Sequence, residues 1–299
     1  MPLFRTASPK GRPSGALFCC VRQGTGHPIA RRGQVTRRLH KAGLAFIFSA
    51  ILAYAVTLHA TNTPPAHCTA DHIDEHVTVE RLYDGDTVKL SDGRRVRFIG
   101  INTPEIGHRG ASPQPLAGTA RDMLQALLEQ SRHTIGLRYD AERQDRYGRD
   151  LAHVYLRDGS SVEARLLEHG LATIMPVPPN LWNLACYQAV EQRARKARRG
   201  IWALPEYQPV AAIQLRQHDT GMRLIKGKVT ASRLLKGDIW LTLDDTLLLH
   251  IGRRDRSHFP ATFPAGVSGH TVIARGRLYF AEGALRMQIR HPATLEMAQ

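Results

Sequence analysis

Apolar positions between residues 77 and 156 fall into short runs separated by turn signals, a pattern typical of β-strands. Ser91-Asp92-Gly93 separates two of these runs, and it predicts a hairpin because an Asp-Gly turn tolerates positive φ. The predicted strands are Val77–Leu82, Asp86–Leu90, Arg94–Gly100, Thr134–Tyr139 and Leu151–Leu156.

Three other segments carry helix signals. Pro115–Gln130 has apolar residues at 116, 120, 123, 124, 127 and 128, which is helical spacing. Ser160 and Glu163 match a capping box that opens a short helix. Leu181–Arg199 is predicted to be a long helix, and its strongly basic end suits the helix dipole. Strands and helices together predict an α+β domain, mainly β with helices.

The pattern changes after Pro205. Residues 221–251 and 269–297 consist of short strand-like runs, broken by turn-forming residues at 236–238 and 282–283. No stretch in this part has the helical spacing of the earlier segments. The sequence therefore predicts a second, mostly β domain.

Residues 42–60 form a nearly continuous apolar segment that follows the basic run 37–41. One interpretation is a signal peptide with Ala53-Tyr54-Ala55 as a small-x-small cleavage site. Another is an uncleaved inner-membrane anchor, since the segment has close to the ~20 residues that span a bilayer. A buried core helix is disfavoured because the apolarity is continuous rather than periodic. In the first two cases the positive-inside rule predicts that everything after residue 60 is exported, to the periplasm or beyond.

The four cysteines divide at this segment. Cys19 and Cys20 precede it, whereas Cys68 and Cys186 follow it. Because exported proteins meet an oxidising environment, Cys68 and Cys186 are predicted to form a disulfide. Two separate buried thiols are the alternative.

The excess of basic residues makes a polyanion a possible partner. The chain has 299 residues, 42% of them hydrophobic and 22% charged, which is typical of a globular protein. Its formal net charge is +15, but residues 1–41 hold nine Lys or Arg and no acidic residue. The modest basic excess in the rest suits nucleic acid and equally suits a merely soluble surface.

Three short motifs carry candidate chemistry: 84–87 (DGDT), 97–105 (RFIGINTPE) and 145–149 (DRYGR). They contain oxygen ligands suited to a hard cation, a carboxylate suited to act as a base, and two guanidiniums that can hold a phosphate bidentately. Hydrolysis of a phosphodiester needs all three functions. The ligands are Asp86, Asn102 and the Thr103 carbonyl, the base is Glu105, and the guanidiniums are Arg97 and Arg149.

The motifs, in this order, are followed by Gly170-Leu171-Ala172 and Arg199-Gly200-Ile201-Trp202. Together they resemble the staphylococcal nuclease family over about residues 77–203. The resemblance implies a five-stranded OB-type barrel with three helices. It implies that Asp86, Asn102 and Thr103 hold Ca²⁺, that Arg97 and Arg149 stabilise the transition state, and that Glu105 activates or positions water. It also implies that Arg146 and Tyr147 contact a neighbouring substrate phosphate.

Two positions depart from the family pattern. The family's type member has Asp where this chain has Asn102, so the site loses one charge and calcium is expected to bind more weakly. The family also has tyrosines in the loop after the Gly-Leu-Ala segment. Here that loop, 175–179, contains no aromatic residue, so a base-stacking contribution of ~1–3 kcal/mol is missing or comes from elsewhere.

The C-terminal region resembles, more loosely, the OB-type domain that follows such barrels in some bacterial proteins. The segments that carry this resemblance are 227–229, 269–276 and 289–292. The predicted organisation is then a basic tail over 1–41, a signal peptide or anchor over 42–60, a linker over 61–76, a nuclease-like domain over 77–205 and a second small β-barrel over 206–299. OB-folds often bind single strands, but a structural role suits this region equally.

The sequence thus favours an exported, monomeric, calcium-dependent endonuclease that acts on DNA and RNA and prefers single strands. All the candidate catalytic residues precede residue 203, so the C-terminal region is expected to be dispensable for the chemistry. One rival is a non-catalytic nucleic-acid-binding module of the same fold. The other is an envelope interaction protein in which both barrels bind protein or glycan.

Overall fold

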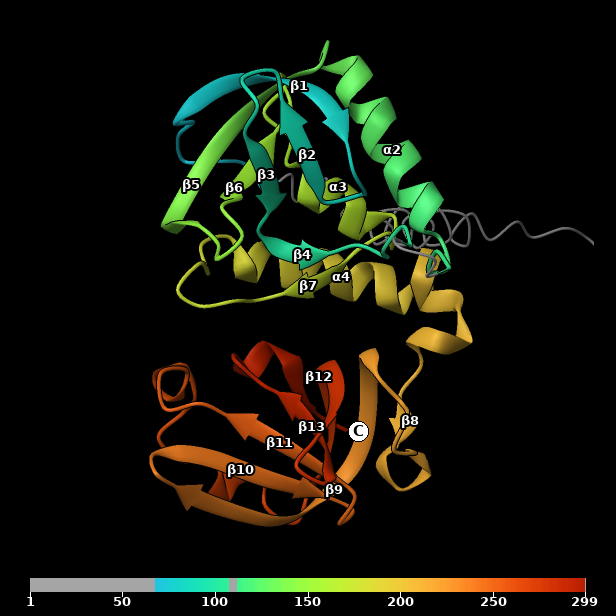
Figure 1. Ribbon diagram of the computed structural model, residues 1–299, viewed down its shortest axis with the longest axis vertical. Coiled ribbons are helices and arrows are strands. Elements are labelled where there is room, and N and C mark those ends of the chain that lie inside the picture. Colours follow the sequence, from blue (N-terminus) through green and yellow to red (C-terminus); the bar gives the residue numbers. More distant parts are fainter. Residues whose placement is uncertain (1–67, 108–111, 299) are drawn as a thin grey trace, which may run out of the picture. The chain divides into compact units, whose positions relative to one another are not determined.

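The computed structural model describes residues 68–107 and 112–298. These residues belong to one compact unit (Figure 1). The expectations for residues 1–67, including the apolar segment 42–60, lie outside the described part. Within that part, none of the helices is long and apolar enough to cross a membrane.

Five strands close into a barrel in the order β1-β2-β3-β6-β5. The neighbours pair antiparallel except β3 and β6, which are parallel. This confirms the predicted five-stranded barrel. The strands are β1 (Glu75–Leu82), β2 (Thr87–Leu90), β3 (Arg95–Phe98), β5 (Thr134–Gln144) and β6 (Asp150–Tyr155).

Strand β5 extends five residues beyond the predicted end at Tyr139. Its added residues are mostly charged and exposed, so no apolar alternation marks them. The extension matters because it leads into the turn 145–149 that connects β5 to β6. The hairpin between β2 and β3 lies where expected, and Gly93 has the positive φ (94°) of its turn.

Three α-helices accompany the barrel, as predicted: α2 (Ala117–Gln130), α3 (Val162–Glu168) and α4 (Leu184–Lys196). The predicted cap of α3 was wrong by one residue. Ser161 is the N-cap, and its hydroxyl accepts a hydrogen bond from the Ala164 amide at 3.2 Å. Ser160 instead donates its hydroxyl to Asp158 Oδ1 at 2.6 Å, because the preceding turn offers a closer acceptor.

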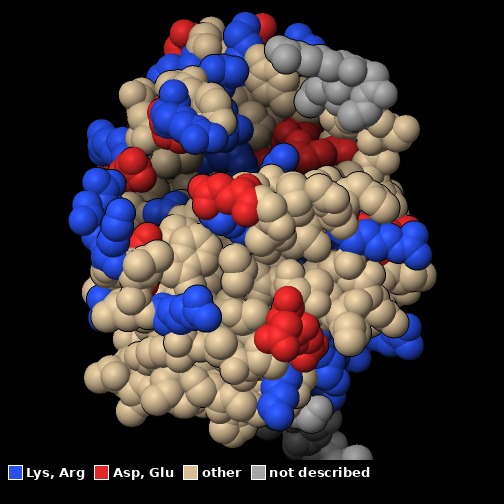
Figure 2. Space-filling model, turned by 60° about the horizontal axis from the view of Figure 1, so that its bottom comes forward, with Lys and Arg blue, Asp and Glu red and all other residues tan. Residues whose placement is uncertain are grey.

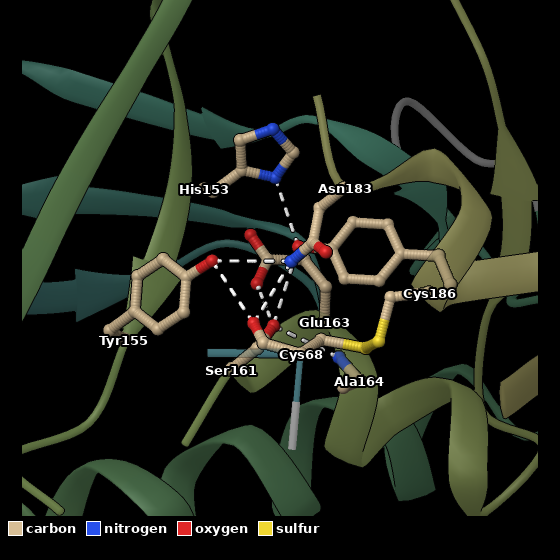
Figure 3. The surroundings of a disulfide bond; sticks show 9 residues. Cys68, His153, Tyr155, Ser161, Glu163, Ala164, Asn183 and Cys186 are labelled. Carbon is tan, nitrogen blue, oxygen red and sulfur yellow. Dashed lines mark hydrogen bonds between the residues drawn. A yellow bond between two sulfur atoms is a disulfide. The ribbon is translucent and has the colours of Figure 1, made fainter. Parts of the chain in front are cut away.

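Glu163 is fully buried in the barrel and anchors α3 to β6. Its carboxylate accepts from the Val154 amide at 2.8 Å and from the Ser161 hydroxyl at 2.7 Å (Figure 3). Tyr187 lies within the same cluster and contacts Ser161 and the Nδ1 of His153. Burial raises the pKa of Glu163 to about 7, against the lowering effect of these hydrogen bonds.

A disulfide joins Cys68 to Cys186 in α4, with their Cα atoms 5.7 Å apart (Figure 3). The segment before β1 is also held by its backbone, because the Cys68 carbonyl accepts from Asn183 Nδ2 at 2.9 Å and from the Tyr155 hydroxyl at 3.2 Å. The two cysteines are 118 residues apart in sequence. Closing a loop of that length stabilises a fold by about 4–5 kcal/mol in the chain-entropy model.

A two-stranded sheet that the sequence pattern did not predict joins β4 (Gly100–Asn102) to β7 (Thr173–Met175). Strand β7 follows the Gly-Leu-Ala segment, whose Gly170 carbonyl accepts from the Ile201 amide at 2.8 Å. A Cβ on Gly170 would lie 2.1 Å from the Arg199 carbonyl oxygen, so the approach requires glycine. The segments that contain Gly170 and Gly200 are therefore in contact, and this contact holds β7 next to its partner strand β4.

The region after Pro205 contains a second set of paired strands. The pairings β9–β10, β10–β11, β11–β13, β13–β12 and β12–β9 return to their starting strand, with β11–β13 parallel. This is the order of antiparallel and parallel pairs seen in the first barrel. The strands are β8 (Val210–Ala211), β9 (Gly221–Leu235), β10 (Asp238–Leu243), β11 (Leu247–Ile251), β12 (Thr271–Ala281), β13 (Ala284–Gln288) and β14 (Leu295–Met297).

A buried ion pair joins the two regions. Arg275 on β12 donates to Glu191 on α4 at 2.6 Å, and both side chains are less than 5% exposed. Glu191 also accepts from the Ile174 amide of β7 at 2.7 Å. Because an unpaired buried charge is costly, this pair fixes β12 against α4 and β7.

The pH dependence of stability tests the burial of Glu163. Between about pH 4.5 and 7 the folded state keeps a proton on Glu163 that the unfolded state has released, so folding weakens as pH rises. Glu163→Gln lacks this titration. We expect the free energy of unfolding of the wild type, minus that of the variant, to fall by about 3 kcal/mol from pH 4 to pH 8 in chelator.

Urea unfolding at a series of pH values measures this difference. Subtraction removes the opposing contribution of buried His153, whose pKa burial lowers to about 4. A difference that is constant across the pH range would show that Glu163 is not held in a low-dielectric site.

Candidate functional site

Asp86 lies in the loop between β1 and β2 and connects three segments of the chain. Its Oδ2 accepts from the Thr103 amide at 2.8 Å and is paired with Arg97 Nη2 at 3.1 Å. Its Oδ1 accepts from the Thr87 hydroxyl at 3.1 Å. The side chain is almost fully buried. A buried carboxylate needs such partners, so Asp86 fixes the end of β4 next to β3.

Arg97 projects from β3 toward the same point and is 8% exposed. Its guanidinium donates to the Phe98 carbonyl, to the Ile101 carbonyl at 3.0 Å and to Asn102 Oδ1 at 3.3 Å. These contacts hold the planar group in one orientation. Arg97, Asp86, Asn102 and Thr103, which the sequence predicted as neighbours in function, are therefore brought together in space.

Close packing supports this arrangement from the other side. Gly85 lies between the two aspartates of the DGDT motif, and a Cβ there would lie 2.8 Å from the Thr103 methyl group and 3.0 Å from Ala120 of α2. Glycine at this position therefore lets the motif approach Thr103 and α2 closely.

Asp84 is a second buried carboxylate at the site, and its Oδ1 accepts from the Asp86 amide at 3.0 Å. Burial, together with the negative charges of Asp86 and Glu105, raises the pKa of Asp84 to about 7. A cation next to a carboxylate such as Asp84 favours its charged form and so opposes this shift. Asp84 was not among the predicted ligands, and the structure adds it to the site as an electrostatic neighbour of Asp86.

The oxygens near Asp86 are chemically suited to a hard divalent cation, since they come from carboxylates, an amide and a carbonyl. In the structure these atoms bind one another, because Asn102 Nδ2 donates to the Thr103 carbonyl at 2.9 Å and Asn102 Oδ1 accepts from Arg97. Within residues 68–107 and 112–298, no three His, Cys, Asp or Glu side chains converge as a metal cluster. The donor set therefore fits calcium only with the backbone and amide oxygens included.

Glu105 follows β4 and is exposed, directly after the buried Thr103 and Pro104. Its backbone is fixed by Gln114, because the Glu105 amide donates to Gln114 Oε1 at 3.0 Å and the Glu105 carbonyl accepts from the Gln114 amide at 3.0 Å. Its negative charge contributes to the raised pKa of Asp84. The carboxylate is thus an electrostatic neighbour of the buried aspartates while facing solvent.

Arg149 belongs to the turn between β5 and β6, which Asp145 organises. Asp145 Oδ1 accepts from the amides of Tyr147 and Arg149 at 2.9 and 3.0 Å, and its Oδ2 accepts from Arg149 Nε at 2.8 Å. Although burial opposes it, these hydrogen bonds lower the pKa of Asp145. The carboxylate therefore stays charged and fixes one edge of the Arg149 guanidinium.

Tyr147 and Arg146 form the exposed tip of this turn. Arg146 lies over the Tyr147 ring, 4.8 Å from its centroid, and donates to the Tyr147 hydroxyl at 2.6 Å. The ring is 59% exposed. An exposed aromatic ring next to a guanidinium offers both stacking and charge to a nucleotide.

A cavity of about 490 Å³ connects the two arginines. It is lined by Arg97, Arg149, Arg146 and Tyr147 among the predicted residues, and by Asp145 and Arg290 besides. Asp86, Asn102, Thr103 and Glu105 lie outside its lining, and Asp86 and Asn102 contact Arg97. One face of the molecule shows a hollow with recessed acidic side chains and Lys and Arg along one side (Figure 2).

Asp145 and Arg290 are among the lining residues of this cavity that were not predicted as site residues. Asp145 lies in a motif that was recognised, and its position two and four residues before its amide partners is the signal for the turn it forms. Arg290 comes from the C-terminal region, and nothing in the spacing of the first-domain motifs points to it.

Comparison with known proteins agrees with this geometry. The family described as Staphylococcal nuclease homologue matches residues 95–204. The Thermonuclease of Staphylococcus intermedius is 35% identical over 131 residues, which cover 43% of this chain and 76% of that protein.

Two further relatives extend the match to other bacteria. Endonuclease YncB of Bacillus subtilis (strain 168) is 34% identical over 137 residues, covering 44% of this chain but only 64% of that protein. An uncharacterized endonuclease of Escherichia coli O157:H7 is 32% identical over 139 residues, covering 44% and 78%. The chain therefore belongs to the staphylococcal nuclease family and is a hydrolase of the nuclease type.

Proposed function

We propose that this chain is a calcium-dependent endonuclease that hydrolyses phosphodiester bonds of DNA and RNA, with single strands preferred. One observation carries the proposal: Arg97 extends from the buried Asp86 to the cavity that Arg149, Arg146 and Tyr147 also line. A cluster of oxygens suited to a hard cation and a cavity lined by arginines therefore share one fixed guanidinium. The relatives named thermonuclease and endonuclease support the same activity.

Each site residue has a separate role in the proposed hydrolysis. Arg97 and Arg149, each held by a carboxylate, donate hydrogen bonds to the phosphate oxygens as charge builds up on them. Glu105 takes up the proton of the attacking water or orients it. Arg146 and Tyr147 hold a neighbouring phosphate. Asp86, Asn102 and the Thr103 carbonyl would hold calcium, which when bound would supply further positive charge to the site.

The non-catalytic binding module remains the principal rival. The presence of Arg97, Glu105 and Arg149 together favours catalysis, because a module that only binds strands needs no base. The envelope interaction protein is the second rival. Phosphate contacts release counterions, so a steep salt dependence of nucleic-acid binding separates it from a nuclease.

Two substitutions test the catalytic roles. Glu105→Gln removes the base, and Arg149→Ala removes a charge-stabilising donor, so each is expected to slow cleavage ~10²–10⁴-fold. Thermal unfolding should change little, since Glu105 is exposed and Arg149 is bound at a surface turn.

Arg149→Lys is the matched control, because it keeps the charge but loses the two-pronged donor geometry. We expect its rate to lie between those of the wild type and Arg149→Ala. Wild-type rates in Glu105→Gln and Arg149→Ala would remove the proposed mechanism.

Asn102→Asp tests the cation site. The variant gains a charged ligand but loses the amide that donates to the Thr103 carbonyl. We therefore expect lower thermal stability in chelator, a larger stabilisation by calcium, and half-maximal activity at a lower calcium concentration than in the wild type. Calcium titrations of activity and of unfolding temperature measure both effects. If half-saturation does not move in either titration, Asn102 is not a ligand.

We further propose that the described part of the protein is exported, to the periplasm or the outer face of the inner membrane, and acts as a monomer. The apolar segment 42–60 and the Cys68–Cys186 disulfide support export. Alkylation of the protein from intact cells, followed by mass spectrometry without reduction, is expected to leave Cys68 and Cys186 unmodified. Finding both alkylated would contradict export into an oxidising compartment.

A further inference from the structure

A second cavity, of about 230 Å³, adjoins the cavity of the candidate site. The two share Met175, Val177 and Arg290 in their linings. The second cavity is lined further by Arg275, Arg277 and other residues of the C-terminal region. We call these two adjoining cavities the groove; their linings extend from Arg97 and Arg149 to the C-terminal strands.

Three side chains of β12 face this groove. Arg275, Arg277 and Tyr279 alternate along the strand, so they lie on one face, while Ala274 and Leu278 between and beside them belong to the core on the other face. The register of β12 thus places two guanidiniums and a phenol in a row.

Arg275 carries unused hydrogen-bonding capacity. It is 4% exposed and bonds Glu191 through Nη1, while its Nε and Nη2 have no hydrogen-bond partner among the described residues. Buried donors are normally satisfied, so these two N–H groups can donate to a water or to a ligand oxygen at the groove wall. Glu191 fixes the guanidinium at the groove wall, which lowers the entropic cost of binding that ligand.

Arg290 stands at the junction of the two cavities. Its Nη2 donates to the Pro178 carbonyl at 3.1 Å, and its Nε lies 3.4 Å from Asp255 Oδ1. These contacts hold a half-exposed guanidinium beside the loop that follows β7. A substrate that extends from the first cavity toward β12 must pass it.

We propose that the C-terminal region extends the substrate site: a single-stranded nucleic acid continues from the candidate active site past Arg290, and its outlying phosphates bind Arg275 and Arg277. The inference rests on the proposed nuclease function and adds a subsite to it. The ligand chemistry follows from the groove, since phosphate oxygens accept the bidentate hydrogen bonds that guanidiniums offer. Tyr279 and the apolar side chains of Met175 and Val177 offer surfaces to unstacked bases, which a duplex does not expose.

The location differs from the usual nucleic-acid face of OB-folds, which lies on the second and third strands. Those strands correspond to β10 and β11 of the C-terminal ring, and none of their described residues lines the second cavity. The subsite is instead on the fourth strand, β12, which the Arg275–Glu191 pair fixes next to β7.

Arg277→Gln is the sharpest test variant. Arg277 is exposed, and no ion pair of its side chain is found among the described residues, so the substitution removes the charge without disturbing the fold. Arg275→Gln would leave Glu191 buried without its partner and is expected to destabilise the protein. Arg254→Gln is the matched control, because Arg254 is an exposed arginine of the same region outside both cavity linings.

The first readout is binding by the full chain in chelator, with a labelled oligothymidylate of about 20 nucleotides as the probe. We expect Arg277→Gln to weaken binding roughly three- to tenfold and to reduce the slope of log Kd against log salt by about 0.7, the value for one lost phosphate contact on a single strand. Arg290→Gln should act in the same direction. Arg254→Gln should match the wild type.

The second readout is the ratio of kcat/KM for this long strand to that for a thymidine dinucleotide, measured with calcium. A subsite beyond the reacting phosphate favours the long strand, so the ratio should fall several-fold in Arg277→Gln and stay at the wild-type value in Arg254→Gln. A ratio and a salt slope that Arg277→Gln leaves unchanged would overturn the inference.

The experiments can contradict the subsite and the nuclease function independently of each other. If the wild type cleaves both substrates but Arg277→Gln changes neither readout, the subsite is wrong and the nuclease function stands. If the wild type cleaves neither substrate while binding still depends on Arg277, the subsite stands and the nuclease function is wrong. Weaker binding of a duplex with unchanged binding of the single strand would also contradict the proposal.

Discussion

The site depends on one buried ion pair, between Asp86 and Arg97. Asp86 comes from the loop before β2, Arg97 from β3, and the Thr103 amide that shares the Asp86 carboxylate comes after β4. A carboxylate removed from water stays charged at little cost only when such donors surround it. The pair therefore fixes the positions of the predicted cation ligands, and it also fixes the guanidinium that reaches the cavity lined by Arg149.

Much of the first domain could be predicted because its signals are local. The Asp-Gly turn before β3 and the helical spacing of α2 each depend on neighbours in sequence, and the structure confirms both. Long-range contacts were harder to predict. The β4–β7 pair is only three residues long on each side, and it forms because Gly170 and Gly200 let distant segments approach. The N-cap of α3 is Ser161 rather than the predicted Ser160, because the hydroxyl of Ser160 bonds Asp158 instead.

In the candidate site, too, local motifs could be predicted and long-range contacts could not. Asp86, Asn102 and Thr103 were recognisable from their motifs, and the structure places them in contact with Arg97 or with one another. The raised pKa of Asp84 comes from burial and from the neighbouring carboxylates Asp86 and Glu105, which spacing alone does not report. Arg290 enters the cavity from a different region of the chain. The Arg275–Glu191 pair explains how that region reaches the site, since it joins β12 to the helix that supports β7.

Calcium-dependent cleavage by a fixed constellation of oxygens and arginines is the central claim, and one assay tests it most directly. Purified protein is incubated with a labelled single-stranded DNA, first with calcium, then with excess chelator, then with calcium restored. We expect internal cleavage that stops in chelator and resumes with calcium. The reason is that the proposed mechanism needs the positive charge of a cation held by the oxygens around Asp86. Binding of the strand without cleavage at any calcium concentration would contradict it.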